Sequence, residues 1–406
     1  MLEGTLASPR ARRGGALLLA ALVLVALNLR PTLTSVSPLL GDIRAATGMP
    51  FRLASLLTTL PVLAMGLFAL AGGRVSRTIG DRHGVALGLV VIAAACAWRW
   101  SSAGSGALIG SAALAGVGVA LIQALLPGVI KHNYLPRLAL TMGLYSASIM
   151  GGGGLGAVVS PYTAHLAGDW HVGLGIWALP AAAALMAWYA VPGQMPEAAA
   201  AGRGLEPLLR NRRAWLLALY FGLINGGYTS MVAWLPPFFV QRGLTAQHAG
   251  SLLGLMTAAQ VVAALTLPAL ALRSADRRPW LAFGLLLQLT GFIGLQLYPD
   301  TLRWLWVVVT GFGLGGCFAL CLILTLDHLH EPRRAGELAA FVQGVGFIIA
   351  ALAPFAIGWI RDVSGGFGAG WLLLTVSAAA MLGVTTRYAP QGYSAAMRGL
   401  GANKNR

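Results

Sequence analysis

The sequence predicts an all-α membrane protein with twelve transmembrane helices, arranged as two pseudo-symmetric six-helix bundles. Three observations support this fold class. Hydrophobic residues make up 57% of the 406 residues and charged residues only 10%, whereas a soluble domain carries about 25% charge. The chain also divides into twelve apolar stretches, each near the roughly 20 residues that cross a bilayer as a helix. Finally, matching residues recur at one fixed separation in the two halves.

Short polar loops separate the apolar stretches, with one longer exception in the middle of the chain. This segment, 193–213, is rich in Pro, Gly, Ala and Arg, and we expect it to be a cytoplasmic linker. We therefore expect six-helix bundles over 16–192 and 214–387, with cytoplasmic tails at 1–15 and 388–406. The predicted spans are 16–40, 53–72, 84–100, 106–130, 138–160, 172–191, 214–238, 247–271, 279–298, 303–326, 336–359 and 368–387.

An internal repeat relates the two predicted bundles. Asn28 and Asn225 lie 197 residues apart, and three further pairs share this separation. A parallel repeat of two six-helix halves is typical of alternating-access carriers, whose binding site lies near the bilayer midplane between the halves. The further pairs are Gly116-Val117-Gly118 with Gly313-Leu314-Gly315, Lys131 with His328, and Arg137 with Arg334.

The distribution of basic residues predicts the orientation of the chain. With the N-terminus in the cytoplasm, 21 Lys and Arg fall on the cytoplasmic side and six, including Arg99, on the other. This asymmetry over short loops follows the positive-inside rule and places both termini in the cytoplasm. It also accounts for the net charge of +16, because the basic loops face anionic lipid head groups. We therefore expect membrane lipids, and no nucleic acid, as partners.

Arg30 is the one basic residue that neither side accounts for, since it lies inside the first apolar stretch. An arginine near the centre of a span costs about 2.5–3.5 kcal/mol on insertion scales. Arg30 either anchors an anion in a wet cavity or holds the fold by pairing with helix carbonyls or snorkelling. Thr34 falls on the same helix face, and Pro31 removes a backbone donor and loosens the helix.

Several other polar side chains lie deep in predicted spans and complete a candidate substrate-binding set. A buried amide needs hydrogen-bond partners, so each residue either faces a ligand or joins neighbouring helices. The glycines from Gly151 to Gly154 instead predict a seam where helices pack closely. The candidate set is Arg30, Thr34, Gln123, Asn225, Tyr228, Gln260 and Gln343.

Four residues near helix ends are candidates for gating or coupling. Lys131 and Asp327 end the fourth and tenth spans, so they either pair to close the cytoplasmic side or act as independent interfacial charges. Trp234 is a candidate for a gate, an aromatic belt or a substrate contact. Asp327 and His328 are the residues through which a proton could be linked to transport, with simple facilitated movement as the alternative.

The sequence predicts no catalytic set, no metal site and no cofactor. No Asp or Glu lies in the middle of a span, and all seven His fall at helix ends or in loops. The three Cys lie in apolar runs and are too few and too buried for a disulfide framework or a zinc site. A membrane enzyme would need a cluster of reactive groups at membrane depth, so this pattern argues against an enzyme.

Several stretches together resemble the cyanate permease branch of the major facilitator superfamily, and the similarity covers both halves. The stretch in the seventh span is the most specific. The matching stretches are Leu27-Asn28-Leu29-Arg30-Pro31, Thr58-Thr59-Leu60-Pro61-Val62, Ile122-Gln123-Ala124, Leu126-Pro127-Gly128-Val129-Ile130-Lys131, Tyr220-Phe221-Gly222-Leu223-Ile224-Asn225-Gly226-Gly227-Tyr228, Leu326-Asp327-His328 and Gln343-Gly344-Val345-Gly346.

This resemblance implies the twelve-helix facilitator fold, the bacterial inner membrane and transport of cyanate by alternating access. Cyanate is a linear monoanion, and the planar donor fork of one arginine suits such a charge. The sister branch resembles exporters of 2-nitroimidazoles and shares the arginine–proline element of Arg30 and Pro31. Export of small heterocyclic compounds is therefore the alternative function. We expect the protein to act as a monomer.

Overall fold

In the part of the chain that the structure describes, twelve helical segments are long and apolar enough to cross a membrane, as the sequence predicts. The computed structural model describes residues 9–102, 104–134, 137–191, 206–271, 274–329 and 331–397. In the first half the helices are α1 (Pro9–Leu27), α2 (Pro31–Thr34), η1 (Ser37–Leu39), α3 (Leu40–Thr47), α4 (Phe51–Ala54), α5 (Leu56–Ile79), α6 (Asp81–Trp100), α7 (Ser105–Asn133), α8 (Leu138–Ala167), α9 (Trp170–Gly175) and α10 (Ala178–Ala190).

The second half repeats this helical arrangement. Its spans are α12 (Arg212–Gln241), α13 (Ala246–Ala271), α14 (Arg278–Leu297), α15 (Arg303–Asp327), α16 (Pro332–Ser364) and α17 (Gly368–Thr385). The short helices α11 (Glu206–Leu209), η3 (Pro390–Gly392) and α18 (Tyr393–Ala396) lie outside the spans.

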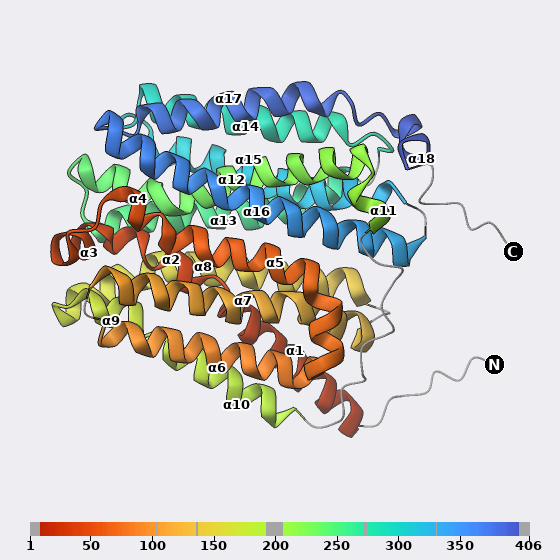
Figure 1. Cartoon of the computed structure of the whole chain (residues 1–406), viewed down its shortest axis with the longest axis horizontal. Coiled ribbons are helices and arrows are strands. Elements are labelled where there is room, and N and C mark those ends of the chain that lie inside the picture. Colours follow the sequence, from red (N-terminus) through yellow and green to blue (C-terminus); the bar gives the residue numbers. More distant parts are fainter. Residues whose placement is uncertain are drawn as a thin grey trace, which may run out of the picture.

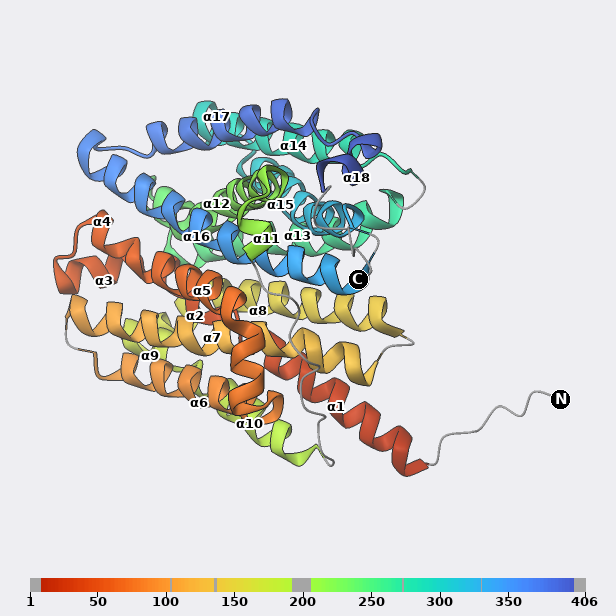
Figure 2. The ribbon, with the colours of Figure 1, turned by 45° about the vertical axis from the view of Figure 1, so that its right-hand side comes forward.

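The two halves form two layers that pack along their length (Figures 1 and 2). Helix α5 lies against α16, and α8 lies against α13. We call the end of the molecule where α1 begins and α17 ends the terminal face, and the end that carries α3 and α4 the opposite face (Figure 1). The layers therefore enclose a space that residues of both halves can line.

Glycines set the same close helix contacts in both halves. A Cβ added to Gly118 would lie 2.7 Å from the Gly88 carbonyl oxygen, and one added to Gly313 would lie 2.5 Å from that of Gly284. Small residues of this kind let helix backbones approach closely. In this packing Gly118 is equivalent to Gly313, 195 residues further on, so the predicted pairing of Gly116 with Gly313 is displaced by two residues.

The first span is not the continuous helix expected over 16–40. Helix α1 ends at Leu27, and the amides of Asn28 and Leu29 donate only three residues back, to Val25 and Ala26. Pro31 then begins α2. Proline has no amide to donate, and its ring clashes with the carbonyl four residues earlier. The break therefore falls around Arg30.

The predicted glycine seam of α8 packs against this break. A Cβ added to Gly152 would collide with the Leu27 carbonyl, and one added to Gly156 would collide with Thr34. Gly153 lies beside the Arg30 side chain, since its added Cβ would be 3.3 Å from the Arg30 Cβ. Small residues thus give the broken helix the room that it needs.

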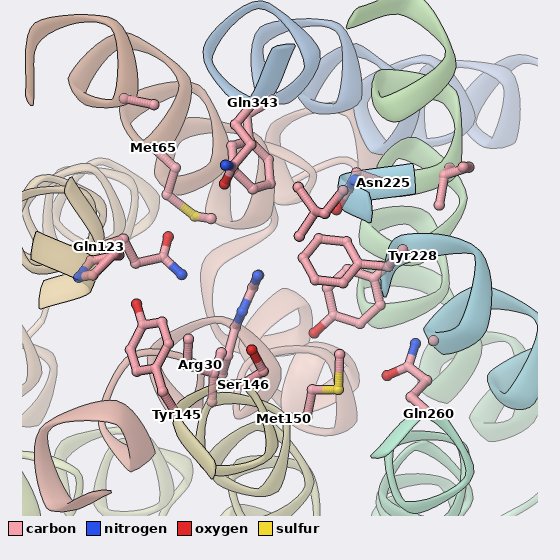
Figure 3. Close-up of a pocket in the computed structure, with 18 of the residues that line it drawn as sticks. Arg30, Met65, Gln123, Tyr145, Ser146, Met150, Asn225, Tyr228, Gln260 and Gln343 are labelled. Carbon is pink, nitrogen blue, oxygen red and sulfur yellow. The ribbon is translucent and has the colours of Figure 1, made fainter. Parts of the chain in front are cut away.

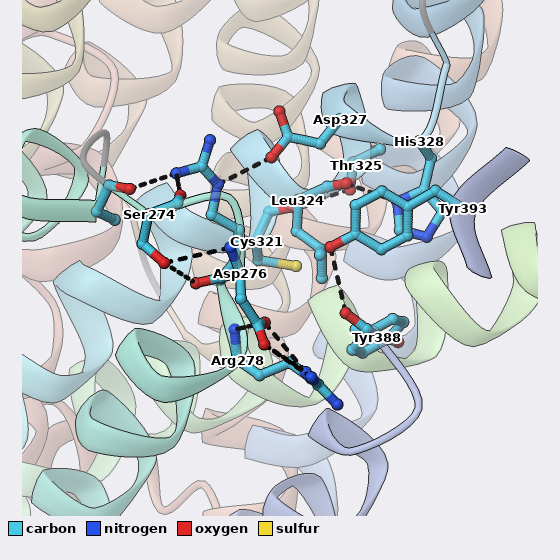
Figure 4. Close-up of polar contacts among 12 residues, drawn as sticks. Ser274, Asp276, Arg278, Cys321, Leu324, Thr325, Asp327, His328, Tyr388 and Tyr393 are labelled. Atoms are coloured by element: carbon cyan, nitrogen blue, oxygen red, sulfur yellow. Dashed lines mark hydrogen bonds and ion pairs between the residues drawn. The ribbon is translucent and has the colours of Figure 1, made fainter. Parts of the chain in front are cut away.

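Three expected non-membrane segments differ from the structure or lie partly outside the described residues. Helix α1 begins at Pro9, so part of the predicted tail 1–15 is helical. Most of the predicted linker lies outside the described residues, as does the end of the tail 388–406. The described part of that tail, through α18, packs beside the ends of α12 and α15 (Figure 4).

Candidate substrate site

A cavity of about 140 Å³ lies between the two layers and is lined by residues from both (Figure 3). Its apolar walls include methionine, phenylalanine and leucine side chains. Such a mixture of apolar walls and a few convergent polar groups is typical of small-molecule sites. The polar side chains that line it are Arg30, Gln123, Tyr145, Ser146, Asn225, Tyr228, Gln260 and Gln343.

Six of the seven predicted substrate-binding residues meet in this cavity. They come from the helix-one break, α7, α12, α13 and α16, so only the folded chain brings them together. Thr34 is the exception and does not line the cavity. Its hydroxyl donates to the Arg30 carbonyl oxygen at 3.2 Å, because the break turns it toward the backbone and α8. Thr34 therefore stabilises the break that carries Arg30.

Arg30 projects into the cavity, and its guanidinium carbon lies 5.3 Å from the centre of the Tyr228 ring. None of the ion pairs among the described residues includes Arg30. The described lining contains no Asp, Glu, Lys or His. The ring face provides a cation–π contact but no negative charge. The site therefore presents one positive charge that no carboxylate of the described residues neutralises.

The side-chain amides of Asn225 and Gln260 differ in whether the protein already supplies them with hydrogen-bond partners. Asn225 is only 2% exposed, and its Nδ2 donates to the Phe221 carbonyl oxygen at 2.9 Å. Gln260 is also 2% exposed, yet its Oε1 has no hydrogen-bond partner in the described protein. A buried amide without a partner is costly. Gln260 thus keeps an amide oxygen that is free to accept a hydrogen bond.

Tyr145 and Ser146 line the cavity from α8, and neither was predicted from the sequence. Figure 3 shows both side chains beside Arg30. A tyrosine or serine inside a span carries no charge and commonly packs between helices. Only the position of α8 against the helix-one break identifies them as lining residues.

On the opposite face, the two halves are joined by a carboxylate and an aromatic cluster. Asp362 of α16 accepts hydrogen bonds from the backbone amides of Phe51, at 3.0 Å, and Arg52, at 2.8 Å. Trp234 is 1% exposed and packs against Phe51 and Phe367, with ring centres 5.9 and 5.8 Å away. Its indole donates to the Pro354 carbonyl oxygen. Trp234 thus lies in this closure rather than in a lipid-facing belt or in the cavity.

On the terminal face, the predicted contact between Lys131 and Asp327 is absent from this state. Asp327 pairs instead with Arg277, with Nε and Oδ2 2.9 Å apart (Figure 4). Arg277 precedes α14 in the same half and is fixed by the Ser274 carbonyl oxygen. Lys131 is exposed at the end of α7. Asp327 therefore takes its partner from its own half.

His328 is a buried packing residue, 1% exposed, at the end of α15. Its ring stacks on Tyr393 with centres 4.1 Å apart, and Nδ1 lies 2.7 Å from the Leu324 carbonyl oxygen (Figure 4). Burial, helped by the nearby charge of Arg213, lowers the pKa of His328 to about 4. His328 is not among the lining residues of the cavity, so its surroundings argue against a role in proton coupling.

The sequence profile of the Major Facilitator Superfamily matches residues 16–354, and the chain belongs to this superfamily. It is 46% identical over 376 residues to the cyanate transport protein CynX of Escherichia coli, covering 92% of this chain and 97% of that protein. It is 30% identical over 351 residues to the 2-nitroimidazole transporter of Escherichia coli, covering 86% and 89%. The family resemblance predicted from the motifs is thus confirmed.

Solved structures confirm the fold. A bacterial homologue of the human lysosomal transporter Spinster, inward-facing and unoccupied, superimposes with a TM-score of 0.74 at 13% identity, covering 96% of this chain and 99% of that one. The nucleoside transporter NupG superimposes with a TM-score of 0.74 at 12% identity, covering 91% and 99%. At these identities the similarity establishes the twelve-helix architecture alone.

Proposed function

We propose that this protein is a secondary transporter that carries cyanate by alternating access through the central cavity. One observation supports it above all others: Arg30 faces a cavity shared by both halves, and no carboxylate among the described residues pairs with it. A monoanion from solution would supply the missing charge. The substrate leaves chemically unchanged, so the protein is not an enzyme.

The chemistry of the lining suits a small anion. The guanidinium offers a planar fork of donors to an anion. At about 4 Å and an effective dielectric of about 20, the attraction is about 4 kcal/mol. The cavity volume of about 140 Å³ accommodates a triatomic anion together with water. Cyanate itself is proposed from the 46% identity to the cyanate transport protein.

We further propose that the terminal face lies in the cytoplasm of a bacterial cell and that the protein is a multi-pass protein of the inner membrane. The excess of basic residues in the loops of that face supports this orientation. The described state is then closed toward the outside by Asp362 and Trp234. Both walls of the site come from one chain, so a monomer suffices for transport.

Export of small heterocyclic compounds is the second candidate. Tyr145, Tyr228, Phe318 and Phe347 give the cavity aromatic walls against which a planar ring could stack. The 30% identity to the 2-nitroimidazole transporter points the same way. Arg30 would then bind a polar substituent instead of a free anion.

Counterflow of labelled cyanate into proteoliposomes that contain the purified protein distinguishes the two functions. We expect accumulation of labelled cyanate against a cyanate-loaded interior, and competition by unlabelled cyanate but not by 2-nitroimidazole. Protein-free liposomes give the background. Absence of cyanate counterflow, together with counterflow of 2-nitroimidazole, would refute the first function in favour of the second.

A further inference from the structure

Arg99 is a second buried arginine, and the substrate site does not account for it. It lies at the end of α6 and is 1% exposed, although Trp98 and Trp100 beside it are 44% and 42% exposed. Arg99 is one of the six basic residues that the charge pattern of the sequence assigns to the outer side, and it lies at the opposite-face end of α6. Its side chain is turned into the protein, while those of the two neighbouring tryptophans face outward.

The guanidinium of Arg99 joins three helices. Its Nη1 donates to the Thr32 carbonyl oxygen in α2 at 3.0 Å, and its Nε donates to Ser111 Oγ in α7 at 3.2 Å. The Ser111 hydroxyl in turn donates to the Leu108 carbonyl oxygen at 2.7 Å. Arg99 therefore connects α6 and α7 directly to the short helix that follows the break.

The charge of Arg99 is poorly compensated for a buried group. No ion pair among the described residues includes it, and its Nη2 has no hydrogen-bond partner there. Burying a charged group without a counter-charge is costly. An uncharged side chain of similar size could fill the same space without this desolvation cost, so the guanidinium has a function beyond packing.

That function is indicated by the element that Arg99 holds. Helix α2 has only four residues and starts with Pro31, and Arg30 is its N-cap residue. A helix this short does not form without tertiary contacts. The carbonyl that Arg99 binds is only two residues from Arg30. Any shift of α2 along α6 and α7 would therefore change the depth of Arg30 in the cavity.

We infer that Arg99 is a positioning residue, which fixes α2 against α6 and α7 and thereby sets the place of Arg30. This inference rests on the proposed function, in which Arg30 binds the substrate. The segment that continues from α2, η1, contacts α12 and α13 of the other half. When the halves separate on the opposite face, Arg99 holds α2 and Arg30 with the first half.

Hydrogen exchange tests the inference without any substrate. Arg99→Met, Ser111→Ala and Arg99→Lys are compared with wild type and with Arg52→Met, which removes an exposed arginine on the same face. We expect the amides of Leu33, Thr34 and Ser35 to exchange about tenfold faster in Arg99→Met and less so in Ser111→Ala. Arg99→Lys should be close to wild type, because an ammonium can still donate to the Thr32 carbonyl oxygen.

Exchange that is unchanged in this segment, or that rises equally throughout the first half, would overturn the inference. Cyanate counterflow then adds a second readout: we expect Arg99→Met to raise KM about tenfold with a smaller effect on kcat. A fall in kcat at unchanged KM would also contradict it. If wild type shows no cyanate counterflow, the proposed substrate fails, while the exchange data still decide the role of Arg99.

Discussion

The carboxylate of Asp362 in α16 accepts a hydrogen bond from the backbone amide of Phe51 in α4, at 3.0 Å, and so joins the two halves of the protein. The backbone amide of Arg52 donates a second hydrogen bond to the same carboxylate, at 2.8 Å. Alternating access requires this connection to break whenever the opposite face opens. The same carboxylate therefore contributes to the stability of the state in which the opposite face is closed.

Asp362→Ala is expected to shift the conformational equilibrium toward an open opposite face. Loss of two charge-assisted hydrogen bonds at an exposed site lowers the closed population about fivefold. Spin labels on exposed cysteines introduced at Ala46 and Ser364 would report the distance across the face. Asp300→Ala is the matched control, because Asp300 pairs with Arg242 of its own half. Identical distance distributions in Asp362→Ala and wild type would contradict this assignment.

Arg30→Ala is expected to abolish cyanate counterflow while the protein remains folded and inserted. Loss of about 4 kcal/mol of attraction corresponds to about a thousandfold weaker binding. Arg30→Lys should fail largely as well, since a point charge does not replace the planar fork. Arg52→Ala serves as the control, and gel filtration verifies folding. Counterflow at the wild-type rate in Arg30→Ala would eliminate the anchor.

Tyr228 offers a way to separate a ring contact from a hydroxyl contact. Its ring lies 5.3 Å from the Arg30 guanidinium carbon, and such a contact contributes about 0.5–2 kcal/mol. We expect Tyr228→Ala to raise the KM for cyanate about five- to tenfold and Tyr228→Phe to leave it within about twofold. An equal loss in both variants would show that the hydroxyl, not the ring, matters.

The buried state of His328 predicts how stability depends on pH. Because burial lowers its pKa to about 4, the unfolded chain binds a proton at this site before the folded chain does. Stability is therefore independent of this group above about pH 6.5 and falls as the pH decreases from there toward 4. The full loss is on the order of 3 kcal/mol.

His328→Phe keeps a ring to stack on Tyr393 and removes the titrating group. We expect its melting temperature to fall less than that of wild type between pH 7 and pH 5, as measured by differential scanning fluorimetry. Its cyanate counterflow at pH 7.5 should stay near the wild-type rate, since His328 does not line the cavity. An equal decrease of the melting temperature in both proteins would refute the assignment of this pH dependence to His328. Loss of cyanate counterflow in His328→Phe would show that His328 takes part in transport.

Several features of the site were predictable because they depend on local sequence. Arg30, Gln123 and Gln260 stand out as polar residues inside apolar runs, and the bilayer leaves such residues few alternatives to a partner or a cavity. Tyr145 and Ser146 carry no such signal. The surroundings of Thr34 could not be foreseen either, because the extent of the break at Pro31 depends on how α8 packs against it.

The sequence by itself determined the twelve spans, the family and the presence of Arg30 as a cation inside the first span, since hydropathy and charge are properties of short stretches and the bilayer enforces them locally. Only the tertiary structure decided which side chains meet. In the folded chain the Arg99 side chain donates a hydrogen bond to α2, Asp327 forms an ion pair with Arg277, and the buried ring of His328 stacks on Tyr393. Those outcomes depend on helix rotation and on contacts between distant segments, which no local pattern encodes.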